Sequence, residues 1–276
     1  RKVDPLVLEE LQKNNALICQ ENYHHSYPHC WRHKTPLIFM ATPQWFISMT
    51  KSGLIDGANR AIRNVNFIPD WGKERMEIML KDRPDWCISR QRDWGIPIPL
   101  FYESESGKLH PNQDKIFNQA SEAIKSSGID SWANIDLGIE EKGFEKSKDI
   151  FDVWFDSGIT HFCVIDELFG SNTQSDLYLE GSDQHRGWFQ SSLLTSIAMK
   201  GIAPYKSVLT HGFVVDDEGR KMSKSIGNVV SPQEIIKDSG ADILRYWIAS
   251  TDFRGEMAFS KDIFSRAKNL APYFQK

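Results

Sequence analysis

The second half of the chain is patterned as short apolar strands, each followed by a turn and a helix. A strand is predicted over 176–180, a turn at Gly181-Ser182 and a helix over 183–200, and the next strand is predicted over 207–215. A parallel pair of strands needs such a crossover helix between them. The pattern therefore predicts an α/β fold with a parallel sheet.

The remaining segments are less regular. Leucine spacing predicts a helix within 4–17, and 35–49 is predicted as a strand, a Thr-Pro turn and a second apolar segment. Residues 103–149 are rich in Glu, Lys, Ser and Asn, which indicates a solvated insertion. The run 231–234 (SPQE) is typical of a capping box with proline at the first helical position. Residues 241–276 are predicted to be mostly helical.

Composition excludes several classes of protein. The chain has 276 residues with a net charge of −4, 40% hydrophobic and 25% charged residues. These values are typical of soluble globular proteins and disfavour disorder, coiled coil or a histone-like nucleic-acid binder. The longest apolar stretches, 36–41 and 96–102, are too short to span a membrane. Four cysteines without a C-x-x-C pair favour a reduced, cytoplasmic setting.

A lysine loop follows the second predicted strand. The run 220–228 (RKMSKSIGN) comes after an acidic turn at 216–219 and carries Lys221 and Lys224 with two serines. Ammonium groups neutralise phosphate oxygens, while hydroxyl and amide groups donate hydrogen bonds, so this loop suits a polyphosphate. Taken on charge pattern alone, a solvated turn is the ordinary interpretation.

The first predicted strand ends in polar residues. Glu180 ends the strand, and Asp183 and Gln184 begin the helix. Ligands of open α/β sheets bind at the carboxyl ends of strands, where a carboxylate can hold an ammonium group or ribose hydroxyls. The alternative is a helix cap at Ser182, with Asp183 favouring the helix dipole.

Two further segments carry candidate site residues. In 151–158 (FDVWFDSG), Trp154 is predicted to form a pocket wall at a strand end, the alternative being a core tryptophan in an edge strand. The histidines of 24–33 lie around Cys30, but Pro28 interrupts any helix that would align them. We favour a polar loop there; zinc is possible, as half a site whose other ligands lie outside the chain. No P-loop or G-x-G-x-x-G motif occurs.

These motifs together resemble the bacterial-type isoleucyl-tRNA synthetases. KMSKS within the lysine loop marks class I aminoacyl-tRNA synthetases, while DVWFDSG and GSDQHRGWF are typical of the isoleucyl family. The resemblance extends to HSYPHCWRHKTPLIF, ATPQWF, RPDWCISRQRDWGIPIP and THGF. It implies the second half of a class I Rossmann-like nucleotide-binding domain, with a small inserted lobe and a helical C-terminal start.

The resemblance also implies a reaction and its residues. Isoleucine would attack the α-phosphate of ATP, giving isoleucyl-adenylate and pyrophosphate, and the acyl group would then pass to tRNA. Glu180 would face the ammonium group and adenylate, Asp183 the ribose, and Gln184, Trp188 and Trp154 the isoleucine. The implied ATP-binding residues are His211, Gly212, Phe213, Val214, Met222, Ser223 and Lys224, and the implied catalytic residues are Lys221 and Lys224.

The implied organisation has five parts. They are the return leg of an editing insertion (1–34), the first part of the catalytic core (35–102), the polar insertion (103–149), the Rossmann half with the KMSKS loop (150–240), and the start of a helical stem or anticodon-binding domain (241–276). No His-x-Gly-His signature occurs in the sequence. We therefore expect the chain to be part of a longer ligase and to catalyse little or no adenylation by itself.

The expected partners are tRNA(Ile), isoleucine and ATP, with Mg²⁺ accompanying ATP as substrate. No membrane partner is expected, and the parent protein is expected to be a cytoplasmic monomer. Two alternatives stay open: a valyl- or leucyl-tRNA synthetase fragment, and a non-catalytic tRNA-binding module whose Arg83, Arg90 and Arg92 meet an RNA backbone.

Overall fold

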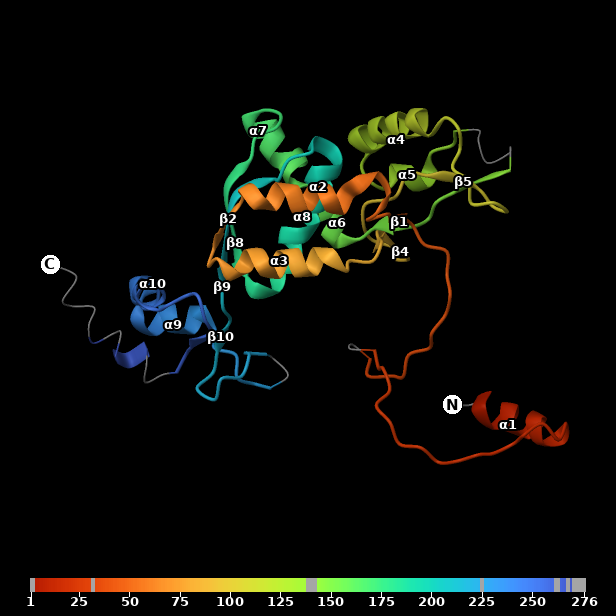
Figure 1. The fold of residues 1–276 in the computed structure, drawn as a ribbon, viewed down its shortest axis with the longest axis horizontal. Coiled ribbons are helices and arrows are strands. Elements are labelled where there is room, and N and C mark those ends of the chain that lie inside the picture. Colours follow the sequence, from red (N-terminus) through yellow and green to blue (C-terminus); the bar gives the residue numbers. More distant parts are fainter. Residues whose placement is uncertain are drawn as a thin grey trace. The chain divides into compact units, whose positions relative to one another are not determined.

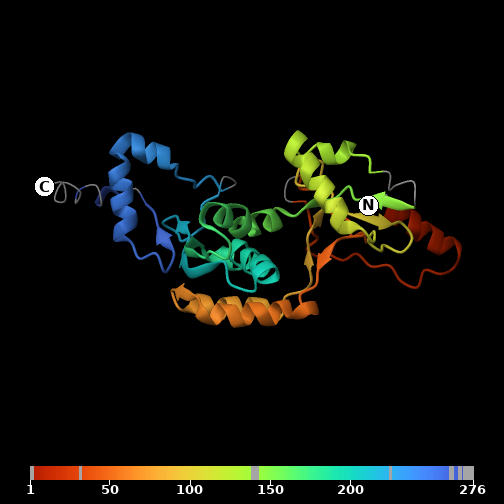
Figure 2. The same cartoon turned by 90° about the horizontal axis from the view of Figure 1, so that it is seen from above.

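The computed structural model describes residues 3–30, 33–137, 143–223, 226–260, 264–266 and 269. It divides into two units, residues 1–43 and 44–276, which are described separately. Figures 1 and 2 show the chain from two directions. No helix in the described part has both the length and the apolar character needed to cross a membrane.

The first unit contains the helix α1 (Val3–Lys13) and a long irregular segment. The predicted N-terminal helix is confirmed, although it ends at Lys13. The strand predicted at the start of 35–49 is wrong: only an isolated bridge joins Pro36 to His29, and Ile38 and Phe39 are 83% and 84% exposed. An apolar run forms a strand only when another strand accepts its backbone hydrogen bonds and a core covers one face.

The second unit is built on a parallel sheet, as the strand–helix alternation predicts. Its strands are β2 (Asn66–Ile68), β9 (Tyr205–His211) and β8 (Ser175–Gly181), in the order β2-β9-β8. Both pairings are parallel, so the carboxyl ends of the three strands lie at one edge. The predicted strand over 207–215 divides after His211, and its second part is β10 (Val214–Val215).

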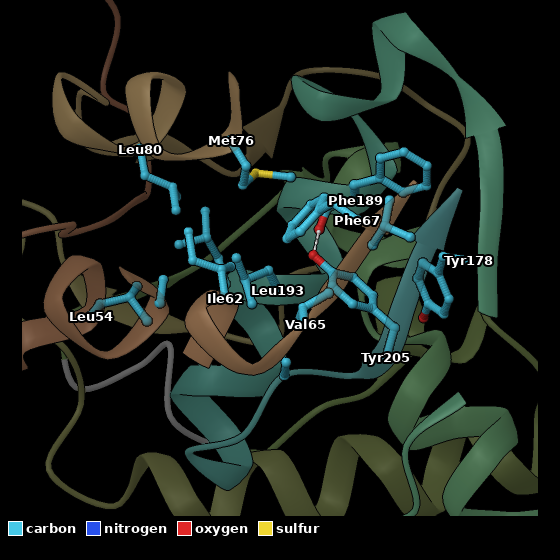
Figure 3. Close-up of a cluster of buried hydrophobic side chains, with 14 of the residues drawn as sticks. Leu54, Ile62, Val65, Phe67, Met76, Leu80, Tyr178, Phe189, Leu193 and Tyr205 are labelled. Carbon is cyan, nitrogen blue, oxygen red and sulfur yellow. Dashed lines mark hydrogen bonds between the residues drawn. The ribbon is translucent and has the colours of Figure 1, made fainter. Parts of the chain in front are cut away.

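Three helices supply the core that packs against this sheet. They are α2 (Leu54–Ala61), α3 (Trp71–Lys81) and α8 (Trp188–Lys200). Figure 3 shows their buried side chains meeting those of the strands. The core contains Met49, Leu54, Ala58, Ile62, Val65, Phe67, Met76, Leu80, Trp86, Tyr178, Phe189, Leu193, Leu194, Ala203, Tyr205 and Val208. Burial of this apolar surface fixes α8, and therefore its first residue, relative to the sheet.

The predicted helix over 183–200 is divided in two. Ser182–His185 form a short 3₁₀ helix (η5), and α8 begins at Trp188. Between them Gly187 adopts φ −112° and ψ −122°, which breaks the helical path. Gly201 follows α8 in the left-handed conformation that favours glycine at a helix end.

The polar insertion has a small core of its own. It contains β5 (Phe101–Glu103), α4 (Gln113–Ser127), α5 (Ser131–Asn134) and β6 (Phe144–Lys146). The strands β5 and β6 pair antiparallel. Phe101, Ile116, Ala120 and Trp132 are buried together beneath the two helices. A composition that is polar overall therefore still supplies enough apolar positions for a separate lobe.

A third core lies after the lysine loop. The helices α9 (Pro232–Ser239) and α10 (Ala241–Ser250) pack together, and β10 pairs in parallel with β11 (Met257–Ala258). Ser231 precedes α9 as predicted, but its hydroxyl bonds Gln233 rather than a backbone N–H. The prediction that 241–276 is mostly helical fails over 251–260, where β11 finds a strand partner in β10.

The other elements are short. Antiparallel pairs join β1 (Phe46–Ile47) to β3 (Trp86–Cys87) and β4 (Ser89–Arg90) to β7 (Ile150–Phe151). Further short helical segments are η1 (Lys51–Gly53), η2 (Ile62–Asn64), α6 (Val153–Gly158), the π-helical η4 (His161–Asp166) and α7 (Glu167–Phe169).

Candidate active site

The carboxyl ends of β8 and β9 bring two predicted site segments side by side. Gly181 lies opposite His211 in the parallel register. A β-carbon on Gly181 would lie 2.9 Å from Asp183 Oδ1, 3.6 Å from His211 Cε1 and 3.7 Å from Phe213 Cε1. Glycine at this position therefore allows three predicted ligand-binding side chains to approach one point.

Two aromatic residues and an amide gather around Gly187. A β-carbon there would lie about 3.0 Å from the Trp154 ring and would clash with Gln184 Oε1. Gln184 Oε1 accepts the backbone N–H of Trp188 at 2.9 Å, and Gln184 Nε2 lies 3.5 Å from Asp183 Oδ2. The predicted isoleucine-binding residues thus form one cluster, which reaches the strand-end cluster through Gln184 and Asp183.

Trp188 is fixed from three sides. Its backbone N–H donates to Gln184, and its Nε1–H donates to the carbonyl of Ser157 at 2.9 Å. Its ring stacks on the buried ring of Tyr178, with centroids 4.0 Å apart and planes 10° apart. Sequence reasoning missed Tyr178 and Ser157: alternation along 176–180 favours Leu177 and Leu179 for the core, whereas the structure exposes both and buries Tyr178.

Trp154 lies on a helix, which corrects the prediction that it stands at a strand end. It belongs to the first turn of α6, and its side chain is 43% exposed. Asp152 precedes the helix in an extended conformation, and its carbonyl accepts the N–H of Phe155. The Asp152 side chain makes no capping hydrogen bond, but a carboxylate before the first turn favours a helix through the helix dipole.

The carboxyl groups of α6 differ in their surroundings. Buried Asp152 pairs with Arg90 at 3.2 Å. Asp156 Oδ1 is buried with no hydrogen-bond partner within the described residues. Burial, followed by the charge of Asp152, raises the pKa of Asp156 to about 6.

The segment after β9 makes a close turn. His211 Nδ1 donates to the carbonyl of Gly212 at 2.7 Å, since a carbonyl oxygen only accepts. A β-carbon on Gly212 would collide with the backbone of Gly255, so only glycine fits there. Val214 follows in β10. The predicted adenosine-binding segment is therefore pressed against the residues that precede β11.

The lysine loop begins beside this turn. Lys221 Nζ lies 3.8 Å from the centre of the Phe213 ring, and Met222 packs on the third core. Ser223 N–H donates to Asn228 Oδ1 at 2.9 Å. Lys224, predicted to bind ATP and to be catalytic, lies outside the described residues. Lys221 is thus joined to the strand-end cluster through Phe213.

The cysteine–histidine segment is the remaining predicted candidate. Cys30 Sγ lies 3.5 Å from His33 Nδ1, and the N–H of Lys34 donates to the carbonyl of Cys30. The described residues hold no group of three or more His, Cys, Asp or Glu side chains that could bind a metal ion. Zinc at this turn stays a prediction.

Comparison with known proteins identifies the family. The family model of class I tRNA synthetases (I, L, M and V) matches residues 8–260. The chain belongs to the class I tRNA synthetases. The resemblance drawn from the motifs and the expectation of an α/β Rossmann-like fold are both confirmed.

Isoleucine–tRNA ligases are among the similar curated proteins. The protein from Marinomonas sp. (strain MWYL1) is 56% identical over 269 residues, which cover 96% of this chain and 29% of that protein. The protein from Vibrio parahaemolyticus is 56% identical over 286 residues, covering 99% and 30%. The chain therefore spans about 30% of the length of the relatives it matches.

Solved structures of class I synthetases share the fold. Mycobacterium tuberculosis methionyl-tRNA synthetase bound by methionyl-adenylate has a TM-score of 0.57 at 21% identity, covering 87% of this chain and 40% of that one. The shared fold therefore extends beyond the parallel sheet to most of the present chain.

Proposed function

We propose that the chain is the second half of the catalytic domain of an isoleucine–tRNA ligase. The supporting observation is the continuous series of contacts at the ends of β8 and β9. It runs from Trp154 and Gln184 to Asp183, then across the space beside Gly181, where a side chain is absent, to Phe213 and Lys221. An aminoacyl nucleotide needs an apolar pocket for its side chain and polar contacts for its phosphate and its ribose, and these three kinds of group occur along this series.

At one end of this series, aromatic side chains provide an apolar wall. Trp188 cannot rotate freely, because its ring is stacked on Tyr178 and its Nε1 is bonded to Ser157. Trp154 lies against Gly187 and is still partly exposed, so its ring can cover a ligand. We assign these rings to the isoleucine side chain, and Glu180 and Gln184 to its ammonium group.

At the other end, polar groups suit the nucleotide. We assign Asp183 to the ribose hydroxyls, and the segment 211–214 with Met222 and Ser223 to the adenosine and its phosphates. Lys221 and Lys224 would neutralise the charge that develops on the phosphates when the isoleucine carboxylate attacks the α-phosphate. Such a reaction is accelerated chiefly by positioning and by fixed charge, with few acid–base groups.

In this step one bond to the α-phosphorus forms and one breaks. The bond between the isoleucine carboxylate oxygen and the α-phosphorus forms while the bond from that phosphorus to the bridging oxygen breaks, and pyrophosphate leaves. Transfer of the acyl group to tRNA(Ile) would follow. Mg²⁺ would enter with ATP as part of that substrate.

Exchange of labelled pyrophosphate into ATP tests the proposal. The intact ligase that contains this chain should catalyse isoleucine-dependent exchange, with lower kcat/KM for valine, which lacks one methylene, and for leucine, whose branch point differs. The isolated chain should catalyse little or none. A preference of the intact protein for valine or leucine would contradict the assignment to isoleucine.

Measurement of tRNA binding distinguishes the ligase from the alternative of a non-catalytic tRNA-binding module. Titration of the chain with tRNA at two salt concentrations measures how many phosphates it contacts. Steeply salt-dependent tRNA binding by an intact protein that shows no exchange with any amino acid would favour the binding module.

A further inference from the structure

Asp216 closes the acidic turn, residues 216–219, that leads into the lysine loop. Its Oδ1 accepts the backbone N–H groups of Glu218 at 3.1 Å and Arg220 at 2.8 Å, and its Oδ2 accepts Arg220 Nε at 2.9 Å. The backbone of Asp216 and Arg220 is joined as well. These bonds fold residues 216–220 into a tight turn that ends where Lys221 begins.

Asn228 joins the far end of the loop to the same carboxylate. Its Nδ2–H donates to Asp216 Oδ2 at 2.9 Å, while its Oδ1 accepts the N–H of Ser223 at 2.9 Å. One amide side chain thus holds the beginning, the middle and the end of the loop together. The contact spans twelve residues of sequence across the lysine-bearing segment.

The environment strengthens these bonds. Asp216 is only 7% exposed. Hydrogen bonds from Asn228 and then from the Arg220 backbone lower the pKa of Asp216 to about 2, so the carboxylate is charged at neutral pH. Hydrogen bonds to a charged acceptor are stronger than neutral ones. Within the described residues, every side-chain hydrogen bond of Asp216 and Asn228 goes to a residue within 216–228.

The joined ends determine where the first lysine lies. Lys221 pairs with Val215 in an isolated bridge, and its ammonium group lies over the Phe213 ring. A hollow of about 360 Å³ lies under the loop and is lined by Asp216, Met222, Asn228 and Phe259, among others. The loop therefore has space to move beneath it, and the bonds across its ends limit that movement.

We propose that Asp216 and Asn228 are positioning residues that act as a latch, fixing the point from which the loop presents Lys221 to the phosphates. The proposal rests on the function proposed above. Neither side chain touches the substrate; both act through the lysine loop. A shift of about 1 Å in a positioned group can cost on the order of 10²-fold in rate.

The test exchanges the two groups of the latch in the intact ligase. In D216N the remaining oxygen still accepts the backbone N–H groups of Glu218 and Arg220, so the amide nitrogen faces the Nδ2–H of Asn228, donor against donor. In N228D two carboxylates face each other. Each single variant therefore loses the bond across the loop. The double variant D216N/N228D restores it with donor and acceptor reversed, and position 228 still accepts the Ser223 N–H. The bond from Arg220 Nε is not restored, which leaves a residual loss. We expect kcat of ATP–pyrophosphate exchange to fall roughly 10- to 100-fold in each single variant and to recover to within about fivefold in the double variant.

Other readouts separate positioning from a general loss of structure. The KM for isoleucine should stay within about twofold, since the aromatic cluster is distant in sequence and held by its own bonds. Trypsin cleavage after Lys221 should be faster in both single variants and slow again in the double variant. If D216N does not fold, N228A, which removes only the bridging amide, answers the question with the same readouts.

A matched control lies on the same turn. Glu218 is exposed and pairs with Arg220 at 3.0 Å, but its carboxylate is not part of the latch; E218Q should therefore keep wild-type kcat. Single variants with wild-type kcat, or a double variant as slow as either single variant, would overturn the latch. Absence of exchange in the wild-type ligase would instead overturn the proposed function.

Discussion

The two ends of the candidate site are held in different ways. In the aromatic cluster, Trp188 begins α8 and Trp154 lies on α6, which packs against α8. The buried residues of α8 belong to the core that covers the parallel sheet. The lysine loop is held by a few hydrogen bonds that meet at Asp216 and Asn228. Packed helices open only with much of the domain, whereas loops with few buried contacts open locally. We therefore expect the proposed side-chain pocket to be rigid and the proposed phosphate contact to be movable.

The largest expected effect comes from breaking the core beneath the aromatic cluster. Phe189 is fully buried, and its carbonyl accepts the hydroxyl of Tyr205 at 3.0 Å. F189A leaves a cavity next to the start of α8 and should destabilise the protein by about 3–5 kcal/mol. Urea unfolding of the intact ligase checks this. Phe117, which is 41% exposed on α4, offers the control F117A, with a much smaller expected loss. Equal losses in the two variants would contradict the assigned core.

The next effect concerns the close approach at Gly187. In G187A the new methyl group would meet Gln184 Oε1 and the Trp154 ring. Overpacking of this kind costs about 1–3 kcal/mol, and here the Trp154 ring should move. We expect the KM for isoleucine to rise while the KM for ATP stays close to wild type.

Gly255 supplies the matched control for that substitution. A β-carbon on Gly255 would have no neighbour within 4 Å. G255A should therefore leave both KM values unchanged. A rise in the KM for ATP but not for isoleucine in G187A would show that the aromatic cluster does not bind the amino acid.

The aromatic cluster and the lysine loop also differ in how well the sequence predicts them. The strand over 176–180 and the helix after it follow from local periodicity, and the motif KMSKS identifies the lysine loop without a structure. The contact of Tyr178 with Trp188 could not be predicted, because it depends on how α8 crosses the sheet. The latch could not either, since residues 216 and 228 meet only when the loop closes. Trp154 was misplaced because a short apolar run fits both a strand and a helix turn.

A smaller effect is expected from the carboxyl group beside Trp154. The pKa of Asp156 is raised by burial to about 6, above its value of 3.8 in an unfolded chain. The charged form is therefore disfavoured in the folded state, so stability is full below about pH 4 and falls as the pH rises through about 6. D156N should abolish this loss. After allowance for solvent screening of a partly exposed group, we expect a gain of about 1 kcal/mol at pH 8 and none at pH 4.

Thermal unfolding at the two pH values measures that difference. Asp176 pairs with Lys206 at 2.7 Å, but both side chains are largely exposed. D176N is therefore the control, with no gain in stability expected at pH 8. A D156N protein whose stability still fell between pH 4 and pH 8 as in wild type would assign the titration to another group.

The smallest expected effect concerns the resting place of Lys221. Its ammonium group lies 3.8 Å from the centre of the Phe213 ring, and such a contact at an exposed site contributes about 0.5–1 kcal/mol. F213L keeps an apolar side chain but removes the ring, so trypsin cleavage after Lys221 should rise about two- to fivefold, the equivalent of that energy. Because the latch bonds are untouched, the increase should be smaller than in N228A. An increase as large as that in N228A would mean that the aromatic contact, rather than the latch, limits opening of the loop.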